Sequence, residues 1–336
     1  MKEIFVNKTE EYYEQVRDVN EGMDNELTVS HILRSANQFT KNGLAYGAII
    51  SRNLQIPEGA RMLEIGPGLG DLAENICREL KDFHYTFCDI SYDYIRHLKA
   101  RFRDRRFSFE TGDFLQAKLK DKFDIIICNE VLADFPTLVN MTLYNPKIRQ
   151  GDENAYYDAV SLIKFYGLPL AKTSNFNYGA VKFLDTAKQL LERGGKIFLC
   201  EHASEKPTRI GVFGHSEYTI DFAALEKVAS KLGFAVRRGT MTEMLGINQR
   251  RAIIFYTQPE LKMLYNFFKK RGILLEQRAY EVSEVLDVLE SHGVRLCDRD
   301  EYAKILEAQA KPLRSVTDQF SYLMLESKKE PWSSDS

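Results

Sequence analysis

A glycine-rich turn is the clearest candidate binding site in this sequence. The apolar run Arg61–Ile65 leads into Gly66-Pro67-Gly68-Leu69-Gly70, and apolar residues then recur with helical spacing. Glycines let the backbone approach a ligand closely, and a helix N-terminus presents N–H groups to a polar or anionic group. The spacing G-x-G-x-G, with Glu64 two residues earlier, differs from the G-x-G-x-x-G of dinucleotide-binding proteins. The turn predicts a nucleotide-like ligand; the competing interpretation is a tight strand–helix turn without a ligand.

An acid at the end of the next expected strand fits the same ligand. Asp89 lies near the end of the run His84–Ile90, about 20 residues past the glycines, where a carboxylate can accept hydrogen bonds from both hydroxyls of a ribose. Ser91 follows as the expected N-cap of a helix, so Asp89 could instead serve that helix end. Together with the glycine turn, Asp89 favours ribose binding, with Ile90 as a neighbouring cofactor contact.

The glycine turn followed by Asp89 resembles the class I S-adenosylmethionine-dependent methyltransferases, which implies S-adenosylmethionine as the cofactor. In that pattern an acid after the third strand binds the adenine amino group. Asp113 occupies this place, within Thr111-Gly112-Asp113-Phe114, and Phe114 is expected to flank the base. The resemblance gives Glu64 a supporting role beside the glycine loop or the amine end of the cofactor. An ordinary surface turn is the other interpretation of Gly112-Asp113.

Polar residues are dense after the fourth expected strand. Asn129, Glu130 and Asp134 follow the apolar run Phe123–Cys128. Ligands of open α/β sheets bind beyond the carboxyl ends of the strands. We expect Asn129 to contact the cofactor, and Glu130 and Asp134 to orient a guanidinium or to act as general bases for a hydroxyl or amine. A helix cap is the alternative.

Two histidines are candidates for the acceptor side. His202 follows Glu201 at the end of the fifth expected strand and is the candidate general base, with a merely solvated histidine as the alternative. His215 ends the loop Gly211–His215 and either lines the pocket or belongs to a flexible loop. The sequence shows no dedicated metal-binding cluster, and no metal is expected.

Three stretches resemble the MidA-like methyltransferases, a family whose mitochondrial member is a complex I assembly factor that methylates a protein arginine. These stretches are Leu63–Ile76, Asn129–Pro136, and Tyr218–Phe234 followed by Met241–Ile247. The resemblance covers about residues 60 to 250. It implies a protein side chain, with arginine as the first candidate, as the methyl acceptor.

The chain departs from the MidA-like pattern on the acceptor side. Ala133 stands where the family has an Asp after Asn-Glu, and Asp134 comes one residue later. Glu201-His202-Ala203 replaces the family's Asp-Tyr-Gly after the fifth strand, and the family's N-terminal region is not recognisable in residues 1 to 58. These departures make a small-molecule O- or N-methyltransferase a second hypothesis. A non-catalytic, cofactor-binding assembly factor is the third.

The elements that position these residues alternate between short strands and helices. This order predicts a Rossmann-like α/β fold of the class I methyltransferase type, with a seven-stranded, mostly parallel sheet and helices on both faces. The expected strands are Arg61–Ile65, His84–Ile90, Phe107–Thr111, Phe123–Cys128, Lys196–Cys200, Phe234–Thr240 and a last, antiparallel Phe320–Leu325. Helices are expected at Asp71–Leu80, from Ser91, over Tyr178–Glu192 and from Asp221, and then at Leu261–Lys270, Leu274–Leu289 and Arg299–Ala310.

The elements also suggest a domain organisation. We expect an N-terminal helical segment at 1–58, one methyltransferase domain at 59–328, and a disordered tail at 329–336. Substrate-side insertions are expected at about 137–176 and 259–312, because the strand–helix pattern lapses there for longer than an ordinary connection.

Composition narrows the class of protein. With 46 Lys+Arg against 48 Asp+Glu, the net charge of −2 gives no global attraction to nucleic acid, so no nucleic-acid partner is expected. Five widely spaced cysteines without a CxxC pair argue against a disulfide framework and suggest a reducing cytoplasm. The apolar runs are too short to cross a bilayer, so no membrane partner is expected. The expected partner is a protein or small-molecule methyl acceptor; the oligomeric state, a homodimer included, stays open.

Overall fold

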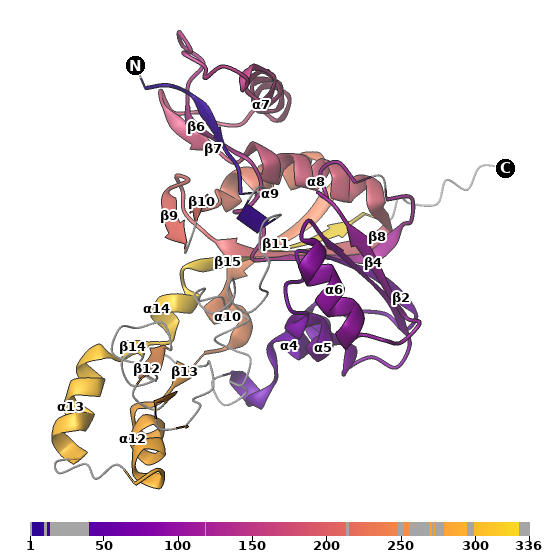
Figure 1. Ribbon diagram of the computed structural model, residues 1–336. Helices are drawn as coiled ribbons and strands as arrows, with labels where there is room; N and C mark the ends of the chain where they lie inside the picture. Colours follow the sequence, from indigo (N-terminus) through magenta and orange to yellow (C-terminus); the bar gives the residue numbers. More distant parts are fainter. Residues whose placement is uncertain are drawn as a thin grey trace.

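The computed structural model describes residues 2–9, 12–13, 40–117, 119–212, 215–247, 252–255, 266, 269–270, 272, 279–293 and 299–328. Within them a seven-stranded sheet forms the centre of the molecule (Figure 1). From one edge to the other its strands are β11 (Phe234–Thr240), β15 (Phe320–Ser327), β8 (Leu191–His202), β5 (Phe123–Asn129), β2 (Ala60–Ile65), β3 (Phe83–Asp89) and β4 (Phe107–Thr111).

Strand directions confirm the predicted sheet. The pairs β4–β3, β3–β2, β2–β5 and β5–β8 are parallel, whereas β15 runs antiparallel to both β8 and β11. The carboxyl ends of β2, β3, β4, β5 and β8 therefore meet at one edge of the sheet. That edge is where the glycine turn, Asp89, Asp113 and Glu130 are placed.

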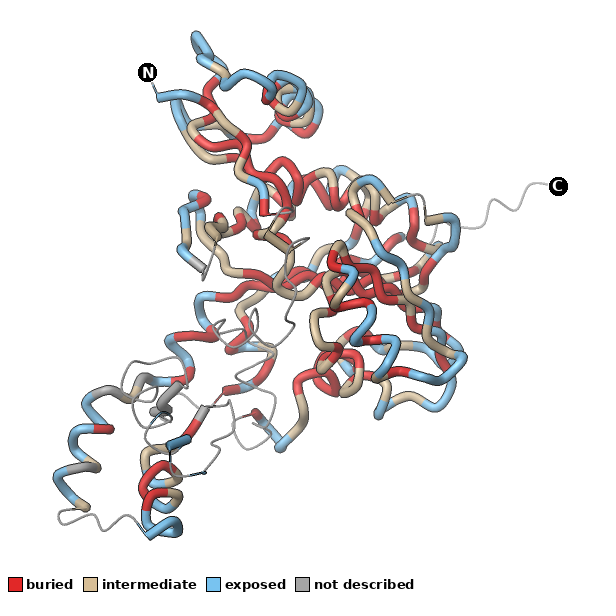
Figure 2. The backbone as a smooth tube through the Cα atoms, viewed as in Figure 1, coloured by how far each residue is buried: buried red, intermediate tan, exposed pale blue. Residues whose placement is uncertain are grey.

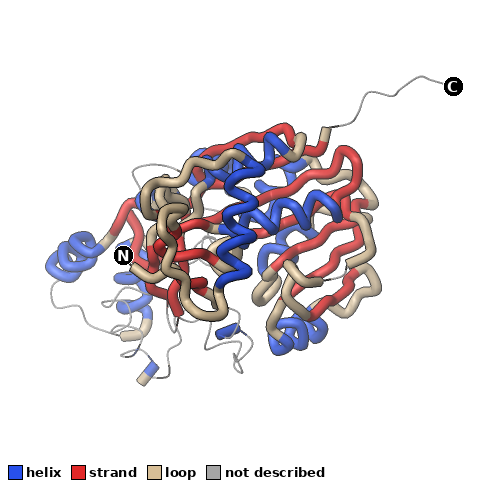
Figure 3. The backbone as a smooth tube through the Cα atoms, turned by 90° about the horizontal axis from the view of Figure 1, so that it is seen from above, coloured by secondary structure: helices blue, strands red, loops and turns tan. Residues whose placement is uncertain are grey.

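Alternating apolar residues in the strands build a core on each face of the sheet. Met62, Ile125 and Ile127 pack on one face, and Leu63 and Ile126 pack on the other. The first face is covered by α4 (Tyr46–Leu54), α5 (Asp71–Cys77), α6 (Tyr92–Arg101) and α10 (Met241–Leu245); the second is covered by α8 (Tyr178–Leu190) and α9 (Phe222–Lys231). Figure 3 shows helices lying along the strands, and Figure 2 shows buried residues both in the central sheet and in the helices beside it.

Two predicted helix caps are present. Ser91 Oγ accepts a hydrogen bond from the Tyr94 N–H at 3.4 Å at the start of α6. Asp221 Oδ1 accepts from the N–H groups of Ala223 and Ala224, both at 3.0 Å, at the start of α9. The expected end of α8 was wrong: the helix stops at Leu190, and Gly194-Gly195 lies inside β8, with Gly194 at φ +74°. Pairing of β8 with β5 begins at Leu191, which ends the helix early.

The first predicted insertion builds its own small sheet. It contains β6 (Thr137–Met141), α7 (Glu153–Tyr166) and β7 (Ser174–Phe176). β1 (Phe5–Asn7) pairs antiparallel with β6, which also pairs with β7, so the N-terminus joins this insertion (Figure 1). The segment 1–58 is therefore not wholly helical as predicted. The strand partner of Phe5–Asn7 lies far along the chain, so nothing local revealed it.

The second insertion lies partly outside the described residues. β12 (Ala252–Phe255) pairs with β13 (Ala279–Tyr280) and with β14 (Lys311–Pro312) beside α12 (Val282–Ser291) and α13 (Arg299–Gln309). The helix predicted at Arg299–Ala310 is confirmed as α13. The helix predicted at Leu274–Leu289 begins only at Val282 among the described residues, because Ala279–Tyr280 pairs in the small sheet.

Most of Leu261–Lys270 and the tail 329–336 fall outside the described residues. The remaining elements are the 3₁₀ turn Lys41–Gly43, α14 (Arg314–Thr317), and a hairpin of β9 (Arg209–Val212) and β10 (His215–Tyr218). No helix within the described part of the chain has both the length and the apolar character needed to span a membrane.

Candidate active site

A cavity opens at the carboxyl edge of the parallel strands. Its lining comes from the glycine turn, the end of β3, the turn after β4, the segment after β5 and the N-terminal residues Thr9 and Tyr13. The predicted site residues that line it are Glu64, Gly66, Gly68, Asp89, Ile90, Asp113, Phe114, Asn129, Glu130 and Asp134. Gly70 and His202 are not among the lining residues. Five chain segments thus bring the predicted cofactor-binding residues (the cofactor half) together with Glu130 and Asp134 (the acceptor half).

Two glycines of the turn adopt backbone conformations that other residues rarely take. Gly66 has φ +61° and Gly68 has φ +52°. A Cβ on Gly66 would lie 2.4 Å from Cγ2 and 2.9 Å from Cγ1 of Val131, which follows β5. The turn can therefore pack against the segment that contains Glu130 only with glycine at position 66.

We expect Gly66→Ala to destabilise the fold by more than its backbone strain alone. Gly233 has a similar φ of +86°, but a Cβ there would meet nothing within 4 Å, so Gly233→Ala isolates the strain of about 1–2 kcal/mol. Gly66→Ala adds overpacking, typically about 1–3 kcal/mol, and should also weaken cofactor binding. Urea unfolding and calorimetric titration measure both effects. Equal losses in the two variants would contradict the packing argument, and Val131→Ala should recover part of the Gly66→Ala loss.

Gly70 has a packing role in place of the predicted cofactor contact. It lies at φ +82° at the start of α5, and a Cβ there would be 2.6 Å from Phe102 Cε2 and 2.7 Å from Leu98 Cδ2. The third glycine therefore lets α6 approach the turn. Arg101 of α6 reinforces this contact by donating to the Leu69 carbonyl and, at 2.7 Å, to Asp71 Oδ1.

Asp89 contacts the start of α6 and also lines the cavity, while its binding of a ribose stays a prediction. Its side chain is buried and lines the cavity, and its Oδ1 accepts a hydrogen bond from the Ser91 N–H at 2.8 Å. Burial raises the pKa of Asp89 to about 7, against the opposing effect of the Ser91 and Gly68 backbone N–H groups. The carboxyl is thus held rigidly at the strand end where a ribose would lie.

Glu64 is the second buried carboxyl of the cofactor half. Its Oε2 accepts a hydrogen bond from the Tyr85 hydroxyl at 2.9 Å. Burial raises the pKa of Glu64 to about 7, and the negative charges of Asp89 and Asp71 add to this rise while the Tyr85 bond opposes it. Two carboxyls with raised pKa values in one cavity are typical of a functional site.

These raised pKa values predict that cofactor affinity increases with pH. Below about pH 7 the buried Asp89 carboxyl is mostly protonated and accepts weaker hydrogen bonds from a ribose. S-Adenosylmethionine should therefore bind more tightly at pH 8 than at pH 6. In Asp89→Asn protein, which lacks this carboxyl, the affinity should change less between these two pH values. Calorimetric titration across this range tests the profile, and a flat wild-type profile would contradict it.

The same shifts predict the opposite trend for stability of the ligand-free protein. Both carboxyls have pKa values near 4 when unfolded and about 7 when folded, so the folded state holds their protons more tightly. Their contribution to stability is full below about pH 4 and is lost as the pH rises through about 7. Urea unfolding of the ligand-free protein at several pH values measures this loss.

Asp113 and Phe114 lie at the predicted position after β4, and both line the cavity. Asp113 Oδ1 accepts from the Leu115 N–H at 2.9 Å, and its Oδ2 accepts from Gln116 Nε2 at 2.8 Å. Phe114 is buried against Phe183 of α8, with ring centroids 5.2 Å apart. These contacts hold the turn firmly, so that one wall of the cavity is preformed.

The segment after β5 presents Glu130 in a strained backbone conformation. Glu130 has φ +57°, and its N–H donates to the Cys200 carbonyl of β8 at 2.8 Å. Asn129 Nδ2 donates to Glu130 Oε1 at 3.0 Å, while Asn129 Oδ1 accepts from the Tyr46 hydroxyl at 2.5 Å. Left-handed backbone at a non-glycine residue is uncommon and concentrates at functional sites. The chain thus turns at Glu130 to place its carboxylate in the cavity.

Ala133 stands where the MidA-like pattern has an Asp, and Asp134 follows it. Ala133 is buried, and its N–H donates to Glu201 Oε2 at 3.2 Å. Asp134 lines the cavity, and its carbonyl accepts a hydrogen bond from Thr9 Oγ1 at 2.8 Å. A carboxylate is therefore present in the acceptor half, one residue later than in the MidA-like pattern.

His202 was predicted as a general base, and its position does not support this role. β8 continues to His202, which pairs with Phe320 of β15, and the two rings pack with centroids 3.9 Å apart. Burial lowers the pKa of His202 and favours the neutral ring. The adjacent Glu201 is buried, and its two carboxylate oxygens accept from the N–H groups of His202 and Ala133. Cross-strand packing thus takes His202 away from the cavity.

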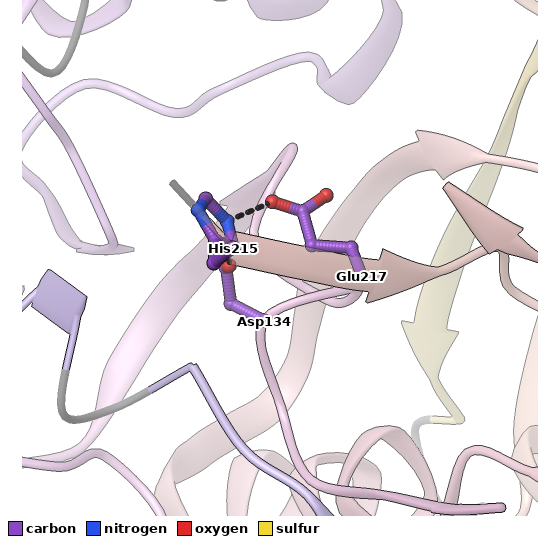
Figure 4. Close-up of side chains that lie close together, drawn as sticks. All are labelled: Asp134, His215 and Glu217. Carbon is purple, nitrogen blue, oxygen red and sulfur yellow. Dashed lines mark hydrogen bonds and ion pairs between the residues drawn. The ribbon is translucent and has the colours of Figure 1, made fainter. Parts of the chain in front are cut away.

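Several residues near the cavity were not predicted from the sequence as site residues. Tyr46 reaches Asn129 from α4, and Thr9 and Tyr13 come from the N-terminal segment. Glu217 of β10 lies beside Asp134, as Figure 4 shows, together with His215, which the sequence predicted either at the pocket or in a flexible loop. His215 begins β10 and is not among the residues that line the cavity. Each of these contacts joins segments that are far apart in the chain. The one signal in the sequence was the spacing of two residues between His215 and Glu217, because two such side chains lie on the same face of a strand.

Comparison with known proteins supports the class of the central domain. Residues 63–165 match the family described as a methyltransferase domain. Over 119 residues the chain is 29% identical to the ribosomal RNA large subunit methyltransferase G of Pseudomonas syringae pv. tomato. That alignment covers 31% of this chain and 31% of the relative, so the chain spans about a third of that protein's length.

Two solved structures are similar to this chain, and the first of them shares its fold. The [4+2]-cyclase SpnF superposes with a TM-score of 0.51 at 12% identity, covering 98% of this chain and 99% of that chain. A phosphoethanolamine N-methyltransferase 2 of Haemonchus contortus superposes with a TM-score of 0.43 at 13% identity, covering 84% of this chain and 52% of that chain. The order and directions of the seven strands are those of the class I methyltransferase fold. Because a cyclase shares it, the fold by itself does not define the reaction.

Residues 63–165 match a methyltransferase domain, and the glycine turn and the fold agree with this match. The sequence resemblance implies S-adenosylmethionine as the cofactor. The residues present fit this cofactor. Glycines form the turn next to the cavity, and the buried carboxyls of Asp89 and Glu64 line it and can accept hydrogen bonds from a ligand. The closer relationship to MidA-like proteins and a cytoplasmic location stay predictions.

Proposed function

We propose that this protein transfers a methyl group from S-adenosylmethionine to a cationic nitrogen of a protein side chain, with the arginine guanidinium as the first candidate. The supporting observation is the charge of the cavity. Among the described residues that line it, the residues of charged type are all carboxylic acids, and none is Lys, Arg or His. They are Glu64, Asp71, Asp89, Asp113, Glu130 and Asp134.

A cavity of this charge favours positive ligands on both of its sides. The sulfonium of the cofactor is cationic, and guanidinium is cationic at every working pH. Carboxylates stabilise such groups by short, charge-assisted hydrogen bonds, and the planar guanidinium fits a carboxylate bidentately. A phosphate-rich acceptor would meet repulsion at the same place.

The chemistry requires positioning more than covalent catalysis. The acceptor nitrogen attacks the methyl carbon in line, a nitrogen–carbon bond forms, and the carbon–sulfur bond breaks, leaving the neutral sulfide S-adenosylhomocysteine. The nitrogen loses one proton to solvent or to a carboxylate. Glu130, held by Asn129 and by its own backbone bond to Cys200, would orient the guanidinium and localise its lone pair on the attacking nitrogen. Asp134 is the second carboxylate available to the acceptor.

Small-molecule O- or N-methylation is the second candidate. It is favoured by the acceptor side, where Ala133 is buried and His202 packs on Phe320 outside the cavity lining. The curated relative acts, by its name, on ribosomal RNA, which makes RNA a further acceptor to examine.

One labelling experiment separates these acceptors. Methyl-labelled S-adenosylmethionine and the purified protein are added to an extract of the host that lacks the gene, and protein, RNA and small-molecule fractions are counted. We expect label in a protein band that yields methylarginine on hydrolysis. Label confined to small molecules or to RNA would overturn the proposal in favour of that acceptor. No label above the level of Glu130→Gln protein would favour the non-catalytic assembly factor.

A further inference from the structure

Three potential metal ligands converge beside the acceptor end of the cavity. Glu217 Oε1 lies 2.6 Å from His215 Nε2, and Asp134 Oδ1 lies 3.8 Å from the same nitrogen (Figure 4). The three ligand atoms all lie within 4.8 Å of one another. We propose that Asp134, His215 and Glu217 bind one divalent metal ion. This proposal goes beyond the proposed function, because it holds whichever acceptor is methylated.

The geometry suits a cation because one nitrogen faces two carboxylates. Ligand atoms about 2.0–2.2 Å from a metal ion lie roughly 3–3.5 Å apart. The observed spacings of 2.6 Å and 3.8 Å lie on either side of this range, so metal binding requires only small side-chain rotations. His215 Nε2 must be deprotonated to bind a metal, and when it is protonated it can donate to Glu217 Oε1 instead. Metal and proton therefore compete for one imidazole nitrogen.

The ligand types indicate which metals are suited. One imidazole with two carboxylates is a mixed nitrogen and oxygen set, which favours Mn²⁺, Fe²⁺, Co²⁺ or Zn²⁺ over Mg²⁺ and Ca²⁺, since the last two prefer oxygen alone. Three protein ligands would leave open positions for water or for a polar group of the acceptor.

The surroundings hold the ligands in place. His215 and Glu217 are two residues apart on β10, which pairs with β9, so their side chains project from the same face. The side chains of His215, Glu217 and Asp134 are 6%, 13% and 19% exposed. The Tyr12 ring packs on the imidazole at 4.4 Å, and the Tyr13 ring packs at 5.3 Å. Such a fixed imidazole loses little freedom when it binds a metal.

A metal ion bound by these three residues would connect two chain segments beside the acceptor half of the cavity. Asp134 belongs to the segment after β5 and lines the cavity, whereas His215 and Glu217 belong to the β9–β10 hairpin. Burial raises the pKa of the nearby Glu201, and the negative charges of Glu217 and Glu130 add to this rise. A divalent cation would offset this repulsion and fix Asp134 in its position.

The test measures metal binding directly. Protein treated with a chelator and then dialysed is titrated with Mn²⁺ by electron paramagnetic resonance and with Zn²⁺ by calorimetry. We expect one ion per chain, an increase in Tm on binding, and at least about 10-fold weaker binding for Glu217→Gln and for Asp134→Asn. The exposed Glu205, which precedes the same hairpin, provides the control Glu205→Gln with wild-type affinity.

Failure of this proposal is distinguishable from failure of the proposed function. Absence of stoichiometric binding, or equal binding by wild-type, Glu217→Gln and Asp134→Asn proteins, would overturn the metal site, and Nε2 would then hold only a proton. His215→Gln checks the nitrogen ligand, and the near-isosteric carboxylate variants keep the test valid if that variant does not fold. S-Adenosylmethionine affinity measured on the same samples reports the cofactor half, which contains none of these three residues.

Discussion

Glu130→Gln should slow methyl transfer by about 10²–10⁴-fold while S-adenosylmethionine affinity stays close to that of the wild type. Gln has nearly the same shape as Glu, and its oxygen can still accept the Asn129 hydrogen bond, so the local fold is kept. The change removes only the negative charge that would orient a cationic acceptor. Single-turnover rates at saturating cofactor measure the slowing, and calorimetry measures the affinity.

A matched control for Glu130→Gln is Glu110→Gln. Glu110 lies on β4 of the same sheet but is exposed and does not line the cavity. It should keep wild-type rate and affinity. Full activity of Glu130→Gln would remove Glu130 from the mechanism, and loss of cofactor affinity together with rate would assign Glu130 to cofactor binding.

Asp89→Ala should weaken S-adenosylmethionine binding by about 1.5–3 kcal/mol, which corresponds to roughly a 10- to 150-fold rise in Kd. The variant removes the carboxyl expected to accept from the ribose hydroxyls. Because Asp89 also accepts from the Ser91 N–H, Tm must be measured alongside affinity. Calorimetric titration near pH 8, where the carboxyl is ionised, gives the full effect.

Asp93→Ala serves as the control for Asp89→Ala. Asp93 lies in the first turn of the same α6 helix, pairs with Arg96 at 2.9 Å and does not line the cavity. We expect its cofactor affinity to match the wild type. Unchanged affinity in a folded Asp89→Ala protein would show that the ribose assignment is wrong.

Complementation of a deletion strain separates an enzyme from an assembly factor. If both Asp89→Ala and Glu130→Gln proteins fold and restore the cellular role, that role does not depend on methyl transfer. If neither restores it while Glu110→Gln does, the role depends on catalysis.

Local signals in the sequence were sufficient to predict most of the polar residues that line the cavity. The glycine turn, Asp89 and the polar residues after β5 each directly follow an apolar strand. A parallel sheet brings the ends of such strands to one edge, so order along the chain predicts proximity in space. The alternation of strand and helix patterns predicted the seven-stranded sheet. The polar residues Ser91 and Asp221, each directly before a helical pattern, predicted the two helix caps.

Only the tertiary structure distinguished residues that share one local pattern. Gly66 and Gly70 belong to the same turn, yet Gly66 borders Val131 at the cavity and Gly70 borders Phe102 and Leu98 in the core. His202 and Glu130 both end a strand, but cross-strand packing on Phe320 removes His202 from the cavity. Sequence position defines the strand end, whereas neighbouring strands decide where the side chain packs.

Contacts between distant segments were decided by the tertiary structure alone. β1 pairs with β6, Tyr46 binds Asn129, and Asp134 meets His215 and Glu217. None of these contacts follows from periodicity or from the ends of sequential strands, because each depends on how an N-terminal segment, an insertion or a hairpin folds back over the sheet. The sequence by itself thus determined which strand-end residues line the cavity, and the folding of these segments over the sheet edge determined which residues lie beside them, such as Tyr46, His215 and Glu217.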